Sequence, residues 1–266
     1  MALANPTRWE TAATAGRRLG HRVEVHRVIG STNDRARALL AIPDGEGVAV
    51  VAEEQAAGRG RLGRTWSSPP DRNLMVSVAF RPSLAAADGA WLGIAAALAA
   101  WRACRTVADV MLKWPNDVID RSGHKVAGLL VETTVDGDRL GAAVIGIGIN
   151  VNWRRAEMPP ELAAATSLAD LAGADVDRAE LLGALLAALD EEVAAVESGR
   201  SPVARFRAAC ATLGTEVEVL VGDRLVTGTA RDVGEDGALV IETDAGEVRC
   251  TSGEVLRVRA RREIGS

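Results

Sequence analysis

The sequence predicts an α+β protein in which a larger domain of mixed helices and strands precedes a small β-barrel. Up to about residue 213, apolar segments with helical spacing alternate with short apolar strands. From Gly214 onward, short strands follow one another, separated by glycines and Asp-Gly turns, which is typical of a small barrel. The chain has 266 residues, 48% of them hydrophobic, enough for an ordinary domain and a small second one. We place the domains at residues 1–213 and 214–266.

The elements follow from caps, periodicity and turns. A first helix ends at Gly20, and a second helix follows a run of N-cap residues, Ser31 to Asp34. Helices are expected at residues 7–19, 35–40, 87–104, 161–171, 178–197 and 203–213. Strands of the larger domain are expected at residues 23–29, 48–52, 74–80, 110–114, 125–135 and 140–151. Strands of the smaller domain are expected at residues 217–219, 225–230, 239–242, 248–250 and 255–258.

The charge and composition argue against several kinds of function. The net charge is −5, whereas sequence-independent DNA binding depends on summed contacts to phosphates. No apolar run reaches the roughly 18–20 residues that span a bilayer. The first residues lack the basic-then-apolar order of a signal peptide. The three cysteines, Cys104, Cys210 and Cys250, lie far apart and show no metal-binding spacing, so the expected compartment is a reducing cytosol.

A long loop is expected at residues 55–71, and its centre alternates glycine with arginine. It reads Gly58-Arg59-Gly60-Arg61-Leu62-Gly63-Arg64, with Gln55 before it and Trp66 after it. Glycines let a backbone approach a ligand closely, and arginines supply charge for a phosphate or a carboxylate. The run lacks the Gly-Lys-Ser/Thr of a P-loop, and it does not open a helix as a dinucleotide fingerprint would. A solvated basic turn or an RNA-contacting loop is the alternative interpretation.

Two lysines are unusual because the 31 basic residues include only these two, Lys113 and Lys125. Codon bias with two chance survivors is one explanation. The other is that both positions need a compact ammonium rather than a planar guanidinium. Lys113 opens the run Lys113-Trp114-Pro115-Asn116-Asp117 at the end of a strand, where sites in α/β folds are usually built. A satisfied turn, with Asn116 and Asp117 bonded to their own backbone, would also fit this run.

Three further segments carry polar groups or glycines at positions suited to a ligand. Lys125 opens an apolar strand that Gly128 interrupts, as where a ligand or a backbone comes close. The run from Gly146 to Asn152 is a glycine-spaced strand ending in two amides; close packing explains its glycines better than it explains Asn150. The run Ser31-Thr32-Asn33 is expected to cap a helix, and a helix N-terminus with hydroxyls also offers donors to a polar ligand.

Together these segments, in this order from residue 23 to about residue 171, resemble the biotin protein ligase family, and the C-terminal barrel also fits. The resemblance implies a catalytic core of mixed sheet and helices, related to class II aminoacyl-tRNA synthetases, followed by an SH3-like β-barrel. It implies an enzyme that activates biotin with ATP to biotinoyl-5'-AMP and releases pyrophosphate. The biotin would then pass to a specific lysine of a biotin carboxyl carrier domain of an acyl-CoA carboxylase. Mg²⁺ usually takes part in such chemistry.

The resemblance also assigns roles to residues. The biotin-binding residues would be Ser31, Thr32, Asn33, Gln55, Gly58, Arg59, Gly60, Arg61, Lys125 and Gly128. The residues that bind ATP and the adenylate would be Arg61, Arg64, Trp66, Lys113, Asn116 and Asn150. The catalytic residues would be Lys125, Lys113, Asp117 and Arg61. No acidic cluster is evident for Mg²⁺, so the phosphates would hold it, with Asn150 or Asp117 as candidate ligands.

The resemblance implies that the loop from Gly58 to Arg64 folds over the ligand and shields the labile adenylate. We expect this loop to be mobile without ligand, because its glycines have little conformational preference and its three arginines repel one another. The apolar Leu62 leaves open how many arginines face the phosphate.

Two rival functions remain at this point. A lipoate ligase or octanoyltransferase shares the ancestral fold but has no need of an arginine-rich loop. A non-catalytic nucleotide- or RNA-binding module would use the basic loop but would not need Lys113 and Lys125. Some members of the resembled family carry a winged helix-turn-helix, and the thirty or so residues before Ser31 are too few for one. We therefore expect an enzyme without nucleic-acid or membrane partners, as a monomer or weak homodimer.

Overall fold

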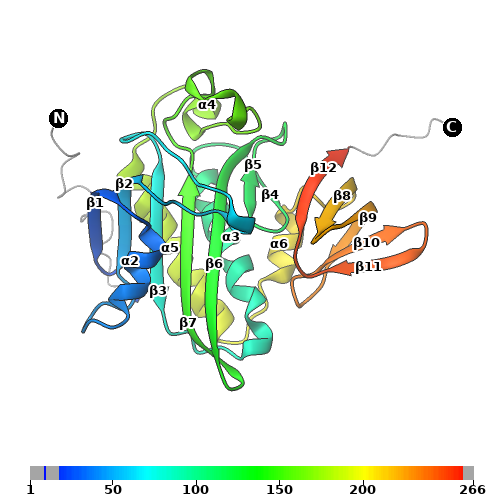
Figure 1. Ribbon diagram of the computed structural model, residues 1–266, viewed down its shortest axis with the longest axis horizontal. Helices are drawn as coiled ribbons and strands as arrows, with labels where there is room; N and C mark the ends of the chain where they lie inside the picture. Colours follow the sequence, from blue (N-terminus) through cyan, green and yellow to red (C-terminus); the bar gives the residue numbers. More distant parts are fainter. Residues whose placement is uncertain (1–8, 10–17, 260–266) are drawn as a thin grey trace.

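The fold is seen in a computed structural model, which describes Trp9 and residues 18–259 (Figure 1). A seven-stranded mixed sheet forms the larger part, and a five-stranded antiparallel sheet packs at one side of it. None of the helices in the described part of the chain is long and apolar enough to cross a membrane. The helix expected over residues 7–19 falls largely outside the described residues.

The central sheet has the strand order β1-β2-β3-β7-β6-β5-β4. The first two strands pair in parallel, and every other neighbouring pair is antiparallel. The strands are β1 (Val23–Ile29), β2 (Ala49–Gln55), β3 (Leu74–Phe80), β4 (Met111–Lys113), β5 (Asp117–Ile119), β6 (Lys125–Asp136) and β7 (Arg139–Ile149). The long hairpin of β6 and β7 in the middle of this order makes the sheet wide enough to be covered on both faces.

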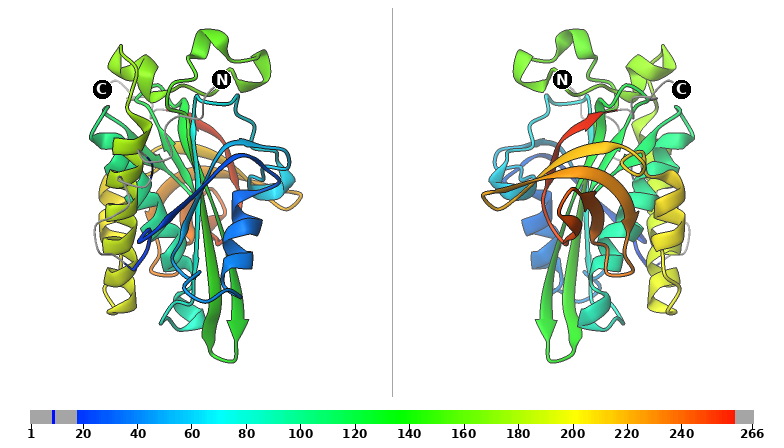
Figure 2. Two further views of the ribbon diagram at one scale, coloured as in Figure 1. Left: turned by 90° about the vertical axis from the view of Figure 1, so that its left-hand side faces the viewer. Right: turned by 90° about the vertical axis from the view of Figure 1, so that its right-hand side faces the viewer.

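Helices cover both faces of the central sheet, as Figure 2 shows in side view. On one face α2 (Thr32–Leu39) packs against β2, β3 and β7. On the other face α3 (Ala90–Arg105) packs on β6 and against α5 (Arg178–Glu197). The remaining helical segments are α4 (Leu168–Ala172), α6 (Val203–Ala209) and the 3-10 turns η1 (Arg61–Gly63), η2 (Ala86–Asp88), η3 (Arg155–Glu157) and η4 (Pro160–Leu162). Because both faces are covered, β3 is buried along its whole length.

The C-terminal sheet has the strand order β11-β10-β9-β8-β12 and matches the SH3-like arrangement expected from the sequence. Its strands are β8 (Glu216–Val221), β9 (Arg224–Val233), β10 (Leu239–Thr243), β11 (Gly246–Cys250) and β12 (Glu254–Arg259). Two indole N–H groups of the larger domain tie the domains together. Trp114 Nε1 donates to the carbonyl oxygen of Gly237 at 3.0 Å, and Trp91 Nε1 donates to that of Glu235 at 2.8 Å.

The sequence predicts a helix over residues 161–171, and this prediction is wrong. The segment contains a 3-10 turn, then an extended stretch, then the five-residue helix α4. The extended stretch pairs with the start of β6: Lys125 N–H donates to the Ala164 oxygen at 2.8 Å, and Thr166 N–H donates to the Lys125 oxygen at 2.9 Å. Ser167 then caps α4 by accepting from the Asp170 N–H. Tertiary pairing therefore overrides the helical preference of the alanines here.

Two further differences from the sequence-based expectation lie near the β4–β5 hairpin. The helix expected over residues 203–213 ends at Ala209, because Ala211 N–H donates to the Leu112 oxygen at 2.8 Å and draws the chain into the sheet edge. The strand β5 was not expected, because Asp117 opens it and hides its apolar pattern. The short hairpin of β4 and β5 places Lys113 directly opposite Asp117.

Candidate active site

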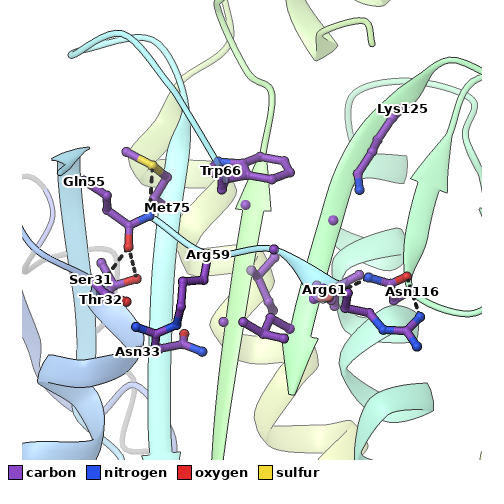
Figure 3. Close-up of a pocket in the computed structure, with 17 residues that line it drawn as sticks. Ser31, Thr32, Asn33, Gln55, Arg59, Arg61, Trp66, Met75, Asn116 and Lys125 are labelled. Atoms are coloured by element: carbon purple, nitrogen blue, oxygen red, sulfur yellow. Dashed lines mark hydrogen bonds between the residues drawn. The ribbon is translucent and has the colours of Figure 1, made fainter. Parts of the chain in front are cut away.

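Two adjoining pockets lie where the loop between β2 and β3 crosses β6 and β7 (Figure 3). The smaller pocket has a volume of about 480 Å³ and is lined by the start of α2 and the glycines of β6 and β7. The larger pocket, about 1160 Å³, extends from the loop to the β4–β5 hairpin and the C-terminal barrel. Residues common to both pockets are Gly60, Arg61, Trp66, Asn116 and Lys125.

Glycines make the floor of the smaller pocket flat. Gly128 and Gly148 lie directly opposite each other on β6 and β7. A Cβ added at Gly128 would lie 3.1 Å from the Trp66 ring, and one at Gly148 would overlap that ring. A Cβ at Gly146 would overlap Asn33 Oδ1. The glycine spacing noted in the sequence therefore lets Trp66 and Asn33 lie against the strands.

Hydroxyl and amide groups line the opposite wall, as the resemblance predicts. Ser31, Thr32 and Asn33 are all buried at the start of α2. Gln55 Oε1 accepts from the Thr32 backbone N–H at 2.8 Å and thereby caps the helix from β2. Ser31 occupies the N-cap position, as expected for this run, but its side chain makes no capping hydrogen bond. Its hydroxyl is instead part of the pocket wall.

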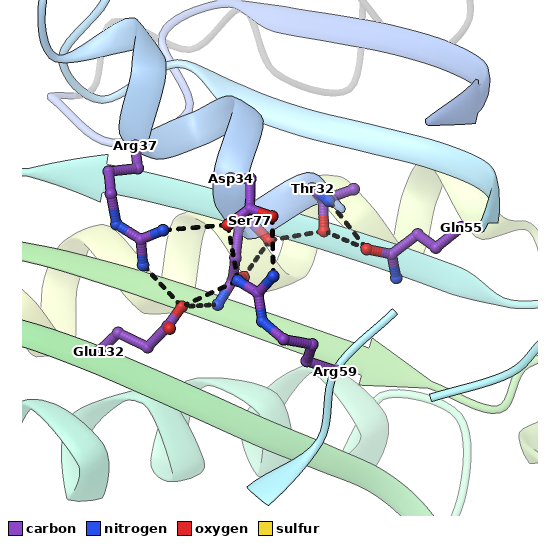
Figure 4. A network of polar contacts seen from close by, with 8 residues as sticks. Thr32, Asp34, Arg37, Gln55, Arg59, Ser77 and Glu132 are labelled. Carbon is purple, nitrogen blue, oxygen red and sulfur yellow. Dashed lines mark hydrogen bonds and ion pairs between the residues drawn. The ribbon is translucent and has the colours of Figure 1, made fainter. Parts of the chain in front are cut away.

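Two arginines of the Gly/Arg loop form ion pairs, and Figure 4 shows the pair made by Arg59. Arg59 donates twice to the Asp34 carboxylate on α2, both at 2.7 Å, and this pairing lowers the pKa of Asp34. Arg64 pairs with Glu254 of the C-terminal barrel. The premise that these arginines repel one another until a ligand anion arrives is therefore wrong for Arg59 and Arg64, because protein carboxylates already balance them.

Arg61 differs from the other two arginines of the loop. It makes no ion pair with a described residue, and its Nη1 donates to Asn116 Oδ1 at 3.2 Å. Burial lowers its pKa from the usual range of arginine, although a guanidinium stays charged in proteins. Leu62 beside it has a left-handed backbone, φ 56°, and is 68% exposed, so it takes no part in the pocket wall of the smaller pocket. Arg61 is thus the loop guanidinium free for an anion.

The two lysines meet around Asp117. Lys125 Nζ lies 2.6 Å from Asp117 Oδ1 and 5.6 Å from the centre of the Trp66 ring. Lys113 lies opposite Asp117 in the β4–β5 hairpin and lines the larger pocket, without an ion pair to any described residue. Burial lowers the pKa of Lys113 below its ordinary value of 10.5. Lys113, Lys125 and Arg61 all interact with Asp117. Together with Arg64 they line the larger pocket opposite the carboxylates of Asp117, Glu161 and Glu254, so positive charge is in slight excess there.

The backbone of Lys125 is held from both sides. In addition to its pairing with the 164–166 segment, its carbonyl oxygen accepts from Asn150 Nδ2 at 3.3 Å. Asn150 Oδ1 in turn accepts from Asn73 Nδ2 at 3.3 Å, and Asn73 Oδ1 accepts from the Val151 N–H at 3.0 Å. Asn150 therefore fixes the start of β6, and both the oxygen and the nitrogen of its amide are hydrogen-bonded to protein groups.

The structure brings together almost all of the residues that the resemblance assigns to the site. The smaller or the larger pocket includes Ser31, Thr32, Asn33, Gln55, Arg59, Gly60, Arg61, Arg64, Trp66, Lys113, Asn116, Asp117, Lys125, Gly128 and Asn150. Gly58 is the exception: it is buried behind the loop, where a Cβ would overlap the Trp66 carbonyl oxygen. Among the described residues, no group of three or more histidine, cysteine, aspartate or glutamate side chains could hold a metal ion.

Four residues of the site were not found from the sequence. Asp34 pairs with Arg59, and Glu254 pairs with Arg64. Ser77 and Glu132 both form hydrogen bonds with Asn33 in the wall of the smaller pocket. Ser77 carries a signal, because it is a polar residue in an otherwise apolar strand, and Glu132 is the first charged residue after the apolar run of β6. Glu254 lies in the C-terminal domain, where nothing in the sequence pattern points to a ligand.

The fold and the site place the chain in the class of ATP-dependent ligases. The chain matches the model of the biotin/lipoate A/B protein ligase family over residues 25–150 and that of the biotin protein ligase C-terminal domain over residues 212–258. It is 35% identical over 239 residues to the biotin–[acetyl-CoA-carboxylase] ligase of Mycobacterium tuberculosis, which covers 86% of each chain. The chain belongs to the biotin protein ligase family.

Other similar proteins agree with this assignment. The bifunctional ligase/repressor BirA of Bacillus subtilis is 31% identical over 242 residues, 89% of this chain and 74% of the relative. The biotin protein ligase of Aquifex aeolicus in complex with biotin and ATP superimposes with a TM-score of 0.71 at 30% identity. That alignment covers 90% of this chain and 99% of the other. The match therefore extends over both domains.

Proposed function

We propose that this protein activates biotin with ATP as biotinoyl-5'-AMP and transfers the biotinoyl group to a lysine of a biotin carboxyl carrier domain of an acyl-CoA carboxylase. The observation that carries the proposal is the junction of the two pockets. A polar cavity with the hydroxyl and amide groups of Ser31, Thr32, Asn33 and Gln55 on one wall opens there onto Lys125, Lys113 and Arg61. Biotin has the matching form, with a polar uncharged head at one end and a carboxylate at the other.

The first half-reaction needs positive charge where two anions meet. With the head of biotin against Thr32 and Asn33, its carboxylate would reach Lys125 at the junction of the pockets. The carboxylate oxygen attacks the α-phosphorus of ATP, and the bond to pyrophosphate breaks. Lys125 and Arg61 would stabilise the charge that develops on the α-phosphate, and Lys113 would bind the departing phosphates in the larger pocket.

The second half-reaction needs a neutral amine. The lysine of the carrier attacks the acyl carbon of the adenylate and displaces AMP. Asp117 is the carboxylate at this position, and its Oδ1 is buried with Lys125 as its only close partner among the described side chains. We infer that Asp117 orients the incoming ammonium and accepts its proton once Lys125 has turned to the phosphate.

Magnesium would enter with the phosphates of ATP. Neither of the protein ligands considered from the sequence is free: Asn150 spends its amide on Asn73 and Lys125, and Asp117 is paired with Lys125. The described residues thus do not fit a preformed magnesium site, and we assign no step to one. Three free, buried cysteines fit a reducing cytosol as the compartment.

The proposal is tested by release of pyrophosphate from ATP. We expect release that depends on biotin, whereas lipoate or octanoate added in its place should give none above the background. Release with lipoate but not with biotin would overturn the proposal in favour of the lipoate ligase alternative. Release with neither, in protein that binds ATP, would leave a nucleotide-binding module.

A further inference from the structure

The carboxylate of Glu132 lies behind the amide wall of the smaller pocket and controls its hydrogen bonds (Figure 4). Glu132 is on β6, seven residues after Lys125, and is not among the residues that line the pocket. Its Oε2 accepts from Asn33 Nδ2 at 2.7 Å and forms an ion pair with Arg37 Nη2 at 2.9 Å. Arg59 Nη2 of the Gly/Arg loop lies 3.8 Å from the same oxygen. Glu132 therefore joins the pocket wall to two arginines that balance its charge.

A carboxylate can only accept hydrogen bonds, so it dictates which end of the Asn33 amide faces it. Asn33 must turn its NH₂ group to Glu132, which leaves Oδ1 on the other side. There Asn33 Oδ1 lies 2.6 Å from Ser77 Oγ, in the completely buried centre of β3. Reversing the amide would set two oxygens against each other at Glu132, an unfavourable contact in a mostly buried position.

The orientation of Asn33 then fixes the hydroxyl behind it. The Ser77 hydroxyl has one proton, and Asn33 Oδ1 has none, so Ser77 donates to Asn33. Ser77 Oγ also lies 2.7 Å from Thr32 Oγ1, whose single proton has both Ser77 Oγ and, at 3.1 Å, Gln55 Oε1 as acceptors. Donation behind the pocket therefore runs from Ser77 to Asn33 and from Asn33 to Glu132.

Asn33 Oδ1 keeps one lone pair for a ligand. The oxygen packs against Gly146, whose lack of a Cβ leaves room for it, and both residues line the smaller pocket. We propose that Glu132 is a positioning residue that sets the polarity of this pocket, so that it selects a ring with an N–H donor at this place, as in a cyclic urea. This inference rests on the proposed function, because the urea is the head group of biotin.

The test compares biotin with its two oxazolidinone analogues, in which a ring oxygen replaces one or the other ureido N–H without added bulk. Binding is measured by calorimetry on the full chain. The wild-type protein should bind one of the analogues at least roughly 100-fold more weakly than biotin, because an acceptor there opposes Asn33 Oδ1. In Glu132→Met the amide is free to turn its NH₂ group to the ligand. The preference for biotin over that analogue should then fall at least roughly 10-fold.

Three further variants separate polarity from charge and from folding. Glu132→Gln keeps an acceptor for Asn33 Nδ2 and should keep most of the preference. Glu132→Thr repeats the removal with a residue that matches the neighbouring Thr133 and Thr134 in strand preference, in case the Met variant does not fold. Glu54→Met, the same change at a half-buried glutamate of β2 outside these contacts, is the matched control and should leave the preference unchanged.

An unchanged preference in folded Glu132→Met or Glu132→Thr overturns the inference, and so does an equal loss in Glu132→Gln, because charge alone would then explain the effect. These results are distinct from failure of the proposed function. In that case the wild-type protein would not bind biotin at all, and no comparison of variants would be needed to show it.

Discussion

Lys125 has little room around its ammonium, and this makes the identity of the residue testable. Gly128 is close enough that a Cβ there would lie 2.7 Å from Lys125 Nζ, and Trp66 covers the other side. We expect Lys125→Ala to lower the rate of adenylate formation by roughly 100-fold or more, because a charge aimed at the reacting phosphate is lost. Lys125→Arg should be nearly as poor, because a planar guanidinium does not fit this space.

The measurement is single-turnover formation of biotinoyl-5'-AMP by the two variants. Arg121→Ala, at an exposed arginine of the β5–β6 turn, is the matched control for loss of a nearby positive charge and should keep the wild-type rate. Adenylate formation by Lys125→Arg at the wild-type rate would show that the role assigned to this residue is wrong.

Burial of Lys113 predicts a pH dependence of kcat/KM for ATP that can be assigned to this residue. Because burial lowers its pKa below 10.5, Lys113 loses its charge at a lower pH than an exposed lysine does. The protonated form binds phosphates, so kcat/KM for ATP should fall as the pH rises through the lowered pKa. In Lys113→Arg the charge persists, and the alkaline fall should move to higher pH even if the rate is reduced. Identical alkaline limbs in the two proteins would remove Lys113 from this role.

At the level of single residues, the sequence predicted the groups that line the two pockets better than the groups that support them. Lys125, Lys113 and the Gly/Arg run carry their own patterns. Ser77 on β3 and Glu132 on β6 form hydrogen bonds with Asn33 only because these strands lie beside α2. No local sequence pattern predicts that these three elements are neighbours.

The Gly/Arg loop is tied at both ends, at Arg59 to α2 and at Arg64 to the barrel, with the left-handed residues Leu62 and Gly63 between them. We expect its middle, around Arg61, to exchange amide hydrogens rapidly in the free protein and slowly with the adenylate bound. Biotin alone should give partial protection, since only the adenylate supplies a phosphate for Arg61. Hydrogen exchange measured in the free, biotin-bound and adenylate-bound states tests this. Equal protection in all three would make the loop a static wall.

Removal of the Arg61 side chain should loosen the closed loop while its two ends stay attached. We expect Arg61→Gly to bind the adenylate more weakly, so that the adenylate escapes and biotinylates lysines of bystander proteins. Labelling of serum albumin added to the reaction measures this escape. Arg72→Gly is the control, because Arg72 lies beyond the loop, is half-exposed and pairs with Glu157. This variant should label no more albumin than the wild-type protein. No rise in albumin labelling by Arg61→Gly would contradict the shielding role.

The elements themselves show where sequence periodicity suffices. The bounds of β1, β3 and α5 agree with the sequence to the residue, because each has a complete apolar pattern between clear turns or caps. The 161–171 segment failed because its backbone pairs with Lys125. Because this pairing is part of the site, the helical preference of the segment is overridden at a functional position.

Across the whole molecule, the barrel reaches the larger pocket but not the smaller one. Gly253, Glu254 and Val255 line the larger pocket, and no residue after Gly148 lines the smaller. Removing the barrel from about Gly214 should therefore leave biotin binding measurable while ligation falls. The division at residues 213 and 214 remains a prediction, and loss of all biotin binding in a truncated but folded chain would count against it.

A substitution tests the same division without exposing the domain interface. Glu254→Gln should weaken the hold on Arg64 and lower the rate of ligation several-fold, with the affinity for biotin unchanged. Glu247→Gln, an exposed glutamate of β11, is the matched control and should change neither quantity. A loss of biotin affinity in Glu254→Gln would join the barrel to the smaller pocket and contradict the separation.

If one site carries both half-reactions, the protein must transfer labelled biotin to a carrier domain, and this transfer can be measured. The purified protein is incubated with radiolabelled biotin, ATP and an isolated biotin carboxyl carrier domain, and label on the carrier is followed with time. We expect ATP-dependent label on a single lysine of the carrier, none with Lys125→Ala, and full suppression by excess unlabelled biotin but not by lipoate. A carrier that stays unlabelled while the protein forms the adenylate, or label that appears without ATP, would contradict the account.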